Sequence, residues 1–307
     1  MTDSLHIQIA LTAPPGDIMR AWTAALPHWF AEHVDVSIAE KRYDFWGRYT
    51  PGAPDREGGR HPLLAYEPGE RVRFGWQLRG VDTTVDVSIH PRAGGQTVAV
   101  RHEGVSKSHD IDFYTDEDFW FLTLENLRRH LDGKPPVRCD FSTPMVGDIQ
   151  HSVEIDAARE AVFDALINPA QLRRWIATRD VVVEAHEGGR YYLGWGNNSS
   201  ALKILDIVPN ERLRLTWPEG DGQTVVTWTL EGSGGKTRLT LVHSGFAPDA
   251  KTGGLNAGWL NFMSWVKSMT EYGAGWQPAI LRLSPGLESY YPASIVEGQV
   301  NIISEPI

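Results

Sequence analysis

The run Pro68-Gly-Glu-Arg-Val-Arg-Phe-Gly-Trp76 returns 141 residues later as Pro209-Asn-Glu-Arg-Leu-Arg-Leu-Thr-Trp217. The same spacing relates His102 to His243. It also relates three further pairs: Val85 and Val226, Gly94 and Gly235, and Gly104 and Gly245. Two pairs of tryptophans keep the same order at slightly different spacings: Trp29 and Trp175, and Trp120 and Trp259. So many collinear matches predict two copies of one structural unit.

Each copy shows the same order of local patterns. A short alternating strand and a helical stretch come first, then about six alternating segments separated by turns, then a long amphipathic helix. Leu213, Leu215 and Trp217 alternate with polar residues, which is typical of an antiparallel sheet with one buried face. The closing helix of the second copy has a single apolar stripe, made of Trp259, Phe262, Met263, Val266 and Met269.

We therefore predict an α+β fold of two tandem domains, each a curved antiparallel sheet wrapped around a long C-terminal helix. The expected bounds are 1–133 for the first domain and 149–274 for the second. A Pro-rich linker over 134–148 joins them, and 275–307 forms an extended strap that packs back on a domain. A cavity can lie between the sheet and the helix of such a domain.

Composition excludes several classes of protein. The lone Cys139 cannot form an internal disulfide or a cysteine zinc site, and it falls in the linker with no adjacent histidine, so we expect no catalytic thiol. A net charge of −10 without basic runs disfavours nucleic acid and membrane surfaces as partners. No long apolar segment and no signal peptide are found, so we expect a cytoplasmic protein. The twelve tryptophans are unusual and favour aromatic-lined interiors or pockets.

The second copy also carries a set of family motifs. They are Val162-Phe163-x-Ala165-Leu166, Leu172-x-x-Trp175, Gly188-Gly-Arg-Tyr191, Pro209-x-Glu-Arg-Leu213, Thr237-Arg-Leu-Thr-Leu241, His243-x-Gly-Phe246 and Gly258-Trp259. Together they resemble the SRPBCC (START-like, helix-grip) superfamily, and within it the family named after the C-terminal domain of the heat-shock-protein-90 ATPase activator. The resemblance implies tandem helix-grip domains. It also implies one of several roles: superfamily members bind lipids, polyketides or hormones, cyclise aromatics, or assist chaperones. The eukaryotic activator has a different N-terminal domain where this chain has a second copy.

Candidate ligand-binding residues lie on the inward faces of the predicted strands and closing helices. The tryptophans at matched positions have core packing as an alternative role, and each histidine has an alternative role in closing its strand. An inward imidazole is otherwise available for acid–base chemistry. The candidates are Tyr43, Trp46, Trp76, His102, Trp120, Tyr192, Trp195, Trp217, Trp228, His243, Trp259 and Met263. Of these, Tyr43, Trp46, Tyr192, Trp195 and Trp228 have no counterpart in the other copy, which makes them better candidates for a pocket specific to one domain.

We expect no metal and no cofactor. The acidic run from His109 to Asp118 lacks the glycine turn of a calcium loop, and helix-dipole placement explains its end. The stretch Gly234-Gly-Lys-Thr237 is no phosphate loop, because the glycine required earlier is replaced by Leu230. The repeated letters Glu57-Gly-Gly-Arg60 and Glu187-Gly-Gly-Arg190 are interpreted as turns.

Three functional hypotheses follow. The first is binding of a hydrophobic, aromatic small molecule in the helix-grip cavity, for sequestration, transport or self-resistance. The second is a cyclase or dehydratase that acts on a polyketide-like substrate with His102 or His243 as a proton-transfer group. The third is a co-chaperone that contacts a heat-shock ATPase. We favour binding over catalysis because no nucleophile, metal or cofactor motif is present in the sequence.

Overall fold

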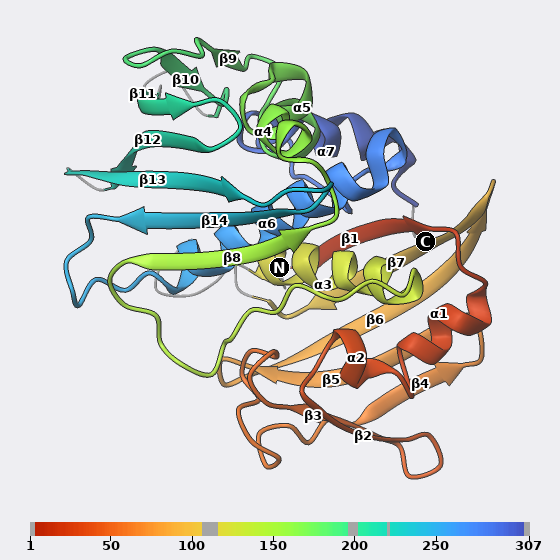
Figure 1. Ribbon diagram of the computed structural model, residues 1–307. Helices are drawn as coiled ribbons and strands as arrows, with labels where there is room; N and C mark the ends of the chain where they lie inside the picture. The colour runs from red at the N-terminus through yellow and green to blue at the C-terminus, as the bar shows by residue number, and fades with distance from the viewer. Residues whose placement is uncertain (1–3, 106–115, 196–201, 220–221, 304–307) are drawn as a thin grey trace. The chain divides into compact units, whose positions relative to one another are not determined.

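Alternating apolar residues form the sheets of this protein, as the burial of every second residue along β14 illustrates (Thr237–Ser244). The computed structural model describes residues 4–105, 116–195, 202–219 and 222–303 (Figure 1). The chain divides into two units. Unit 1 contains residues 1–144, 279–282 and 301–307, and unit 2 contains residues 145–278 and 283–300. The predicted acidic run at 109–115 lies outside the described residues.

Unit 1 is built on a six-stranded antiparallel sheet with the order β15-β1-β7-β6-β5-β4. Its strands are β1 (Ser4–Leu11), β4 (Leu63–Glu67), β5 (Arg71–Leu78), β6 (Val81–Arg92), β7 (Gly95–Glu103) and β15 (Ile280–Leu281). A separate antiparallel hairpin is formed by β2 (His33–Ser37) and β3 (Arg42–Trp46). The glycine of the β6–β7 turn, Gly94, has a φ of 79°, a conformation that glycine adopts without strain.

The described residues of unit 1 also form the helices α1 (Pro15–Ala21), α2 (Leu26–Trp29) and α3 (Asp116–Leu131). α3 is the predicted closing helix and packs against β1, α1 and α2. Its side chains Trp120, Leu124 and Leu127 are fully buried, which confirms the apolar stripe expected from their spacing. Asp116 at its first turn pairs with Arg79 at 2.6 Å.

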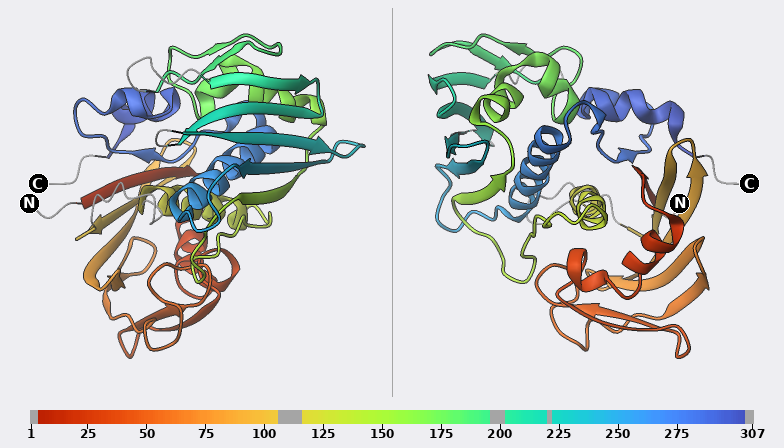
Figure 2. Two further views of the ribbon diagram at one scale, coloured as in Figure 1. Left: turned by 90° about the vertical axis from the view of Figure 1, so that its left-hand side faces the viewer. Right: turned by 45° about the vertical axis from the view of Figure 1, so that its right-hand side comes forward.

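Unit 2 contains a seven-stranded antiparallel sheet with the order β8-β14-β13-β12-β11-β10-β9. Its strands are β8 (Ile149–Ile155), β9 (Val182–Val183), β10 (Arg190–Tyr192), β11 (Leu202–Val208), β12 (Arg212–Glu219), β13 (Gly222–Glu231) and β14 (Thr237–Ser244). The closing helix α6 (Gly253–Tyr272) packs against β8, and Figure 2 shows it running along the face of this sheet. Both units therefore have the predicted helix-grip fold, and the molecule is α+β.

Shorter helices cover the end of unit 2. They are α4 (Arg159–Ile167), α5 (Pro169–Trp175) and α7 (Ala293–Glu297). Asn168 separates α4 from α5: its side-chain Oδ1 accepts the backbone N–H of Ala170 at 2.9 Å, so it caps α5 while proline follows at the first helical position.

The C-terminal segment differs from the extended strap expected from its prolines. Within unit 1, β15 adds to the sheet beside β1, with Leu281 opposite Ile7. Within unit 2, the backbone N–H of Ala293 at the start of α7 donates to the carbonyl of Ala177 at 3.0 Å. Three 3₁₀ turns occupy Gly273–Gly275, Glu288–Tyr290 and Gly298–Asn301. Among the helices described here, none is long and apolar enough to cross a membrane.

Candidate functional site

Each unit buries one histidine near the end of an inner strand. His102 in β7 and His243 in β14 are both 0% exposed, so both point inward as predicted. The indole Nε1–H of Trp120 donates to Nδ1 of His102 at 3.0 Å. Trp259 makes the same bond to Nδ1 of His243, also at 3.0 Å. In both units, therefore, the closing helix is hydrogen-bonded to the sheet through an indole and an imidazole.

The second ring nitrogen of each histidine is engaged as well. Nε2 of His243 lies 2.7 Å from Oγ1 of Thr224, and that hydroxyl lies 3.1 Å from the carbonyl oxygen of Trp217. Because Nδ1 accepts a hydrogen bond from the indole N–H, Nε2 of the neutral ring must carry the ring proton and donate to the hydroxyl, which donates onward to the carbonyl. Unit 1 repeats these contacts at 2.8 and 2.7 Å with His102, Thr83 and Trp76.

This environment holds both imidazoles neutral. Burial lowers the pKa of His102 to about 3, helped by the charge of Arg79, and burial lowers the pKa of His243 to about 4. A protonated ring would place an N–H at Nδ1 against the indole N–H, which is a second reason for a low pKa. Neither histidine thus offers a free nitrogen for proton transfer to a substrate, and the geometry supports a structural role.

The two units differ at the matched pair Trp76 and Trp217. In unit 1 the ring of Trp76 is 2% exposed and stacks on His102, with 5.4 Å between ring centroids and 7° between planes. In unit 2 Trp217 is half-buried, and its ring meets His243 at 70° with centroids 5.9 Å apart. The same residue at the same place in the two sheets is therefore enclosed in one unit and accessible in the other.

Aromatic side chains enclose Trp76 in unit 1. Phe30, Phe45 and Phe119 contact its ring in near-perpendicular geometry, with centroid distances of 6.2, 5.3 and 5.4 Å. All three are at most 3% exposed. Such edge-to-face contacts fill the space between sheet and helix with close-packed rings. The interior of unit 1 around Trp76 is a packed core.

The counterparts of these rings in unit 2 follow from shared hydrogen bonds. Trp29 and Trp175 both donate to the carbonyl of the preceding helix, each at 2.9 Å, which aligns the next residues Phe30 and Ile176. The Tyr43 and Tyr191 hydroxyls both donate to a carbonyl of that region, at 2.5 and 2.7 Å. Two residues further along the chain, Phe45 of unit 1 therefore corresponds to Leu193 of unit 2. Trp120 and Trp259 make the same indole hydrogen bond, so the residues before them, Phe119 and Gly258, also correspond to each other.

Three phenyl rings of unit 1 are therefore replaced by smaller side chains in unit 2, namely Ile176, Leu193 and Gly258. A glycine in place of a phenylalanine removes a whole ring from the space beside the matched tryptophan. These differences accompany the difference in burial between Trp217, which is half-buried, and Trp76, which is 2% exposed.

Two further aromatic residues border Trp217. The ring centroid of Trp195 lies 6.2 Å from that of Trp217, at 82° between planes, and 6.2 Å from that of Phe262 on α6. All three side chains are half-buried, so part of each ring is accessible. Trp195 is held in place because its indole N–H donates to the carbonyl of Ile176 at 2.8 Å. We call Trp195, Trp217 and Phe262 the aromatic site of unit 2.

The sequence-predicted candidates separate into three groups. Tyr43, Trp76, His102 and Trp120 are buried in the core of unit 1, and Tyr192, Trp228, His243, Trp259 and Met263 are buried in unit 2. Trp195 and Trp217 are the predicted candidates that meet at the aromatic site. Trp46 lies apart on β3, half-buried, where its ring stacks on His33 with centroids 5.5 Å apart.

The sequence pattern places Phe262 in the apolar stripe of the helix and does not indicate its part in the aromatic site. It also leaves Tyr43 of unit 1 without a counterpart, although Tyr191 makes the same hydrogen bond. A residue-by-residue comparison next to each matched landmark contains the signal, since Gly258 directly precedes Trp259 as Phe119 precedes Trp120. No group of three or more metal-binding side chains occurs among the described residues.

Comparison with known proteins finds a family model that matches unit 2. Residues 156–271 match the family model described as "Activator of Hsp90 ATPase homolog 1-like protein". Unit 2 resembles the Hsp90 ATPase activator homologues. The match covers less than half of the chain and supports the SRPBCC superfamily predicted from the motifs of this unit. No curated protein is significantly similar to the chain in sequence.

Solved structures give similar but distant matches. The Aha1 dimer from Colwellia psychrerythraea is 21% identical over 43% of this chain and 100% of its own, with a TM-score of 0.35. Protein MLL2253 from Mesorhizobium loti is 27% identical over 39% of this chain and 95% of its own, with a TM-score of 0.34. DynU16, a putative protein in the dynemicin biosynthetic locus, is 14% identical over 88% of this chain and 98% of its own, with a TM-score of 0.33.

Proposed function

We propose that unit 2 binds a hydrophobic, aromatic small molecule at the aromatic site. The observation that carries this proposal is the contrast between Trp217, which is half-buried, and its counterpart Trp76, which is 2% exposed. Partly exposed indole and phenyl rings from β12, α6 and the segment after β10 are a costly surface to leave in water. A ligand with an aromatic face would cover them and gain about 0.5–1.5 kcal/mol per ring contact beyond simple area burial.

Unit 1 has a different part in this proposal. We infer that it is a second copy of the same domain in which Phe30, Phe45 and Phe119 occupy the space where the ligand lies in unit 2. The repeated indole–imidazole–hydroxyl contacts support common ancestry of the two copies. One chain is thus expected to bind one molecule at an aromatic site, in unit 2.

Catalysis by the buried histidines receives no support from the geometry. Both nitrogens of His102 and of His243 are hydrogen-bonded within the protein, and burial lowers both pKa values below 5. A cyclase or dehydratase would need other groups for proton transfer.

The second candidate function is a partnership with a heat-shock ATPase, which the family match over 156–271 favours. A pull-down with that ATPase, scored with and without ligand, tests this alternative.

The binding proposal is tested with N-phenyl-1-naphthylamine, a neutral fluorophore whose emission rises in apolar sites. We expect saturable enhancement with one molecule bound per chain. Gly258→Phe restores the ring that unit 1 has at Phe119 and should abolish the enhancement. Trp217→Leu removes one wall of the site and should weaken binding by about tenfold, which corresponds to about 1.4 kcal/mol.

Trp46→Leu is the matched control, because Trp46 is a half-buried tryptophan of unit 1 outside the aromatic site. Its affinity for the fluorophore should equal that of the unchanged protein. Circular dichroism of each variant verifies the fold. If Gly258→Phe folds and still binds the fluorophore with unchanged affinity, the ligand does not lie at the aromatic site and the proposal fails.

A further inference from the structure

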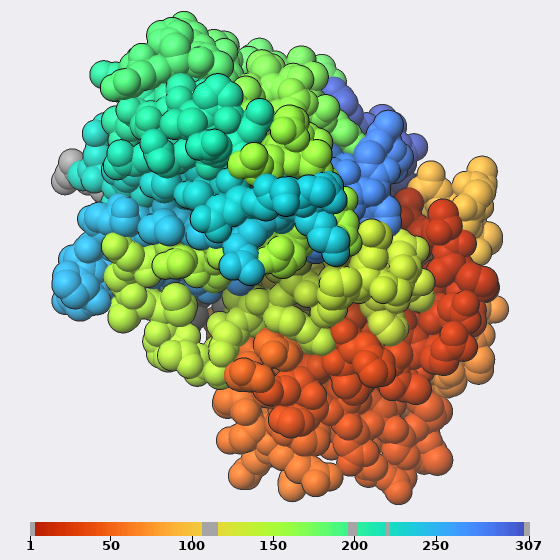
Figure 3. Space-filling model, viewed as in Figure 1, coloured from red at the N-terminus to blue at the C-terminus, as the bar shows by residue number. Residues whose placement is uncertain are grey.

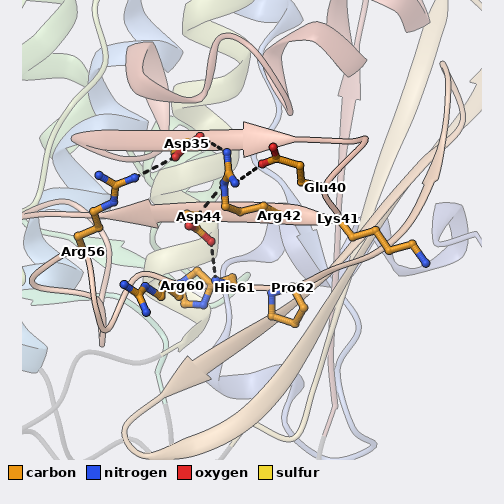
Figure 4. A pocket seen from close by; sticks show the side chains of 9 residues that line it. All are labelled: Asp35, Glu40, Lys41, Arg42, Asp44, Arg56, Arg60, His61 and Pro62. Carbon is orange, nitrogen blue, oxygen red and sulfur yellow. Dashed lines mark hydrogen bonds and ion pairs between the residues drawn. The ribbon is translucent and has the colours of Figure 1, made fainter.

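A polar pocket lies on unit 1. It has a volume of about 620 Å³ and opens between the β2–β3 hairpin and the segment 56–62 (Figure 4). Figure 3 shows this part of the chain, in red to orange, at the surface of unit 1. The lining side chains are almost all charged or polar: Asp35, Glu40, Lys41, Arg42, Asp44, Arg56, Arg60, His61 and Pro62.

Backbone hydrogen bonds fix the shape of this pocket. The N–H groups of Tyr43 and Phe45 donate to the carbonyls of His61 and Gly59, at 2.9 and 3.0 Å, so the segment lies alongside β3 like a further strand. A side chain at Gly59 would come within 2.5 Å of the Phe45 carbonyl oxygen, so this close approach requires glycine. The alternation of β3 then buries Tyr43 and Phe45 on one face and places Arg42 and Asp44 on the face that lines the pocket.

The charges of the pocket do not balance. Asp35 accepts hydrogen bonds from Arg42 at 2.9 Å and from Arg56 at 3.1 Å, and Arg42 also pairs with Glu40. Neither Arg60 nor Lys41 has an ion pair or side-chain hydrogen bond in the part of the chain that the structure describes. Four cationic side chains therefore face three carboxylates, although the whole chain carries a net charge of −10.

His61, which pairs with Tyr43 of β3, is a buried residue at the edge of the pocket. Its side chain is 3% exposed and packs on Phe45 with ring centroids 4.2 Å apart. Its backbone N–H donates to Asp44 at 3.0 Å, but the ring Nε2 has no hydrogen-bond partner. A buried polar atom without a partner costs about 1–3 kcal/mol. Burial also lowers the pKa of His61 to about 4, so the ring is neutral at pH 7.

We propose that this pocket binds a small molecule bearing a phosphate or carboxylate group, with Arg56 and Arg60 holding the anionic group. Arg56 keeps donors free beyond its single bond to Asp35, and Figure 4 shows Arg56 and Arg60 on the same side of the pocket. Guanidinium groups match the planar geometry of both oxyanions and form strong charge-assisted hydrogen bonds with them. An anion at this place also balances the excess positive charge of the lining.

Isothermal titration calorimetry of the full chain tests the proposal with three probes: inorganic phosphate, glycerol phosphate and succinate. We expect saturable binding of at least one probe, weakened by added sodium chloride. Preference for the phosphates identifies a phosphorylated ligand, and preference for succinate identifies a carboxylate. Arg60→Ala should weaken binding at least about tenfold, since a hydrogen bond to a charged group is lost.

Arg92→Ala is the matched control, because Arg92 is an exposed arginine at the end of β6 that does not line the pocket. A nuclear magnetic resonance titration gives a second readout: the imidazole signal of His61, assigned with His61→Gln, should show a raised pKa when the probe is saturating. The proposal is overturned if no probe binds saturably, or if Arg60→Ala and Arg92→Ala weaken binding equally. Because this pocket belongs to unit 1, its failure leaves the aromatic site of unit 2 untouched.

Discussion

The indole of Trp259 donates its N–H to Nδ1 of His243 at 3.0 Å, and this single bond fixes the tautomer of a completely buried imidazole. Since Nδ1 accepts this hydrogen bond, the ring proton resides on Nε2. The Nε2–H group donates a hydrogen bond to the hydroxyl oxygen of Thr224, at 2.7 Å. The bond joins the closing helix α6 to strand β14. Its repetition between Trp120 and His102 indicates that both units use it to hold helix and sheet together.

The neutral state of His243 makes the stability of unit 2 dependent on pH. Its pKa falls from 6.5 to about 4 on folding, so between these values the unfolded chain binds a proton that the folded chain does not. The free energy of unfolding therefore decreases as the pH falls, by about 2 kcal/mol for this group between pH 7.5 and pH 5. His243→Gln should lose about 2 kcal/mol less over that interval than the unchanged protein, measured by urea unfolding at both pH values.

His186→Gln serves as the control, because His186 is an exposed histidine of the same unit. It should leave the pH dependence as it is in the unchanged protein. Equal pH dependence for His243→Gln and the unchanged protein would show that the buried imidazole does not titrate as the geometry requires.

Trp259→Phe isolates the contribution of the indole N–H. Phenylalanine retains an aromatic ring but leaves Nδ1 of His243 buried without a donor, which should cost about 1–3 kcal/mol of stability. The pKa of His243 should rise from about 4, because a proton at Nδ1 no longer meets an N–H group. A nuclear magnetic resonance titration of the imidazole measures this pKa. Trp228→Phe, a buried control whose ring lies 5.7 Å from that of Trp259, should leave it unchanged.

Much of the fold was accessible from the sequence because the repeated landmarks are the residues that hold each unit together. His102 and His243, and the tryptophan pairs Trp29/Trp175 and Trp120/Trp259, recur in the same order, and each of them makes a hydrogen bond that the fold needs. Alternation and helical periodicity indicated the sheets and closing helices. The short helices after Pro292 were missed, since so brief a segment carries too few turns to show a helical period.

The candidate site was harder to predict, because it depends on the size of the side chains that surround a matched tryptophan in each unit. Trp76 and Trp217 look equivalent in sequence, and only their neighbours differ. Those neighbours, Phe119 and Gly258 among them, come from distant parts of the chain and meet the tryptophan only after folding. The polar pocket of unit 1 could not be predicted for the same reason. The sequence around Arg60 indicates only a turn, and folding places Arg60 in one pocket with Asp35 and Arg42.

A buried ion pair on α6 gives a further prediction. Lys267 contacts Glu271 at 2.6 Å, and these side chains are only 7% and 1% exposed. Glu271 also accepts the backbone N–H of Asp156 at 3.1 Å, which ties the helix to the end of β8. Lys267→Met leaves the carboxylate buried without its cation and should cost about 3–5 kcal/mol, measured by urea unfolding.

The double variant Lys267→Met with Glu271→Leu separates charge from packing. Removing both charges should recover much of the lost stability, because no uncompensated ion then remains inside the protein. A double variant as unstable as the sum of the two single changes would instead indicate that the pair acts through packing alone.

Phe119→Ala should open in unit 1 the space that Gly258 leaves in unit 2. The ring of Phe119 is 3% exposed and packs against both Trp76 and Phe30, so its removal should cost about 3–5 kcal/mol and leave an apolar cavity. Because apolar cavities stay dry and accept apolar ligands, this variant should bind two molecules of N-phenyl-1-naphthylamine per chain instead of one. Adding Gly258→Phe should return the number to one, now in unit 1. If Phe119→Ala folds and still binds a single molecule that Gly258→Phe eliminates, the phenyl ring is not what closes unit 1.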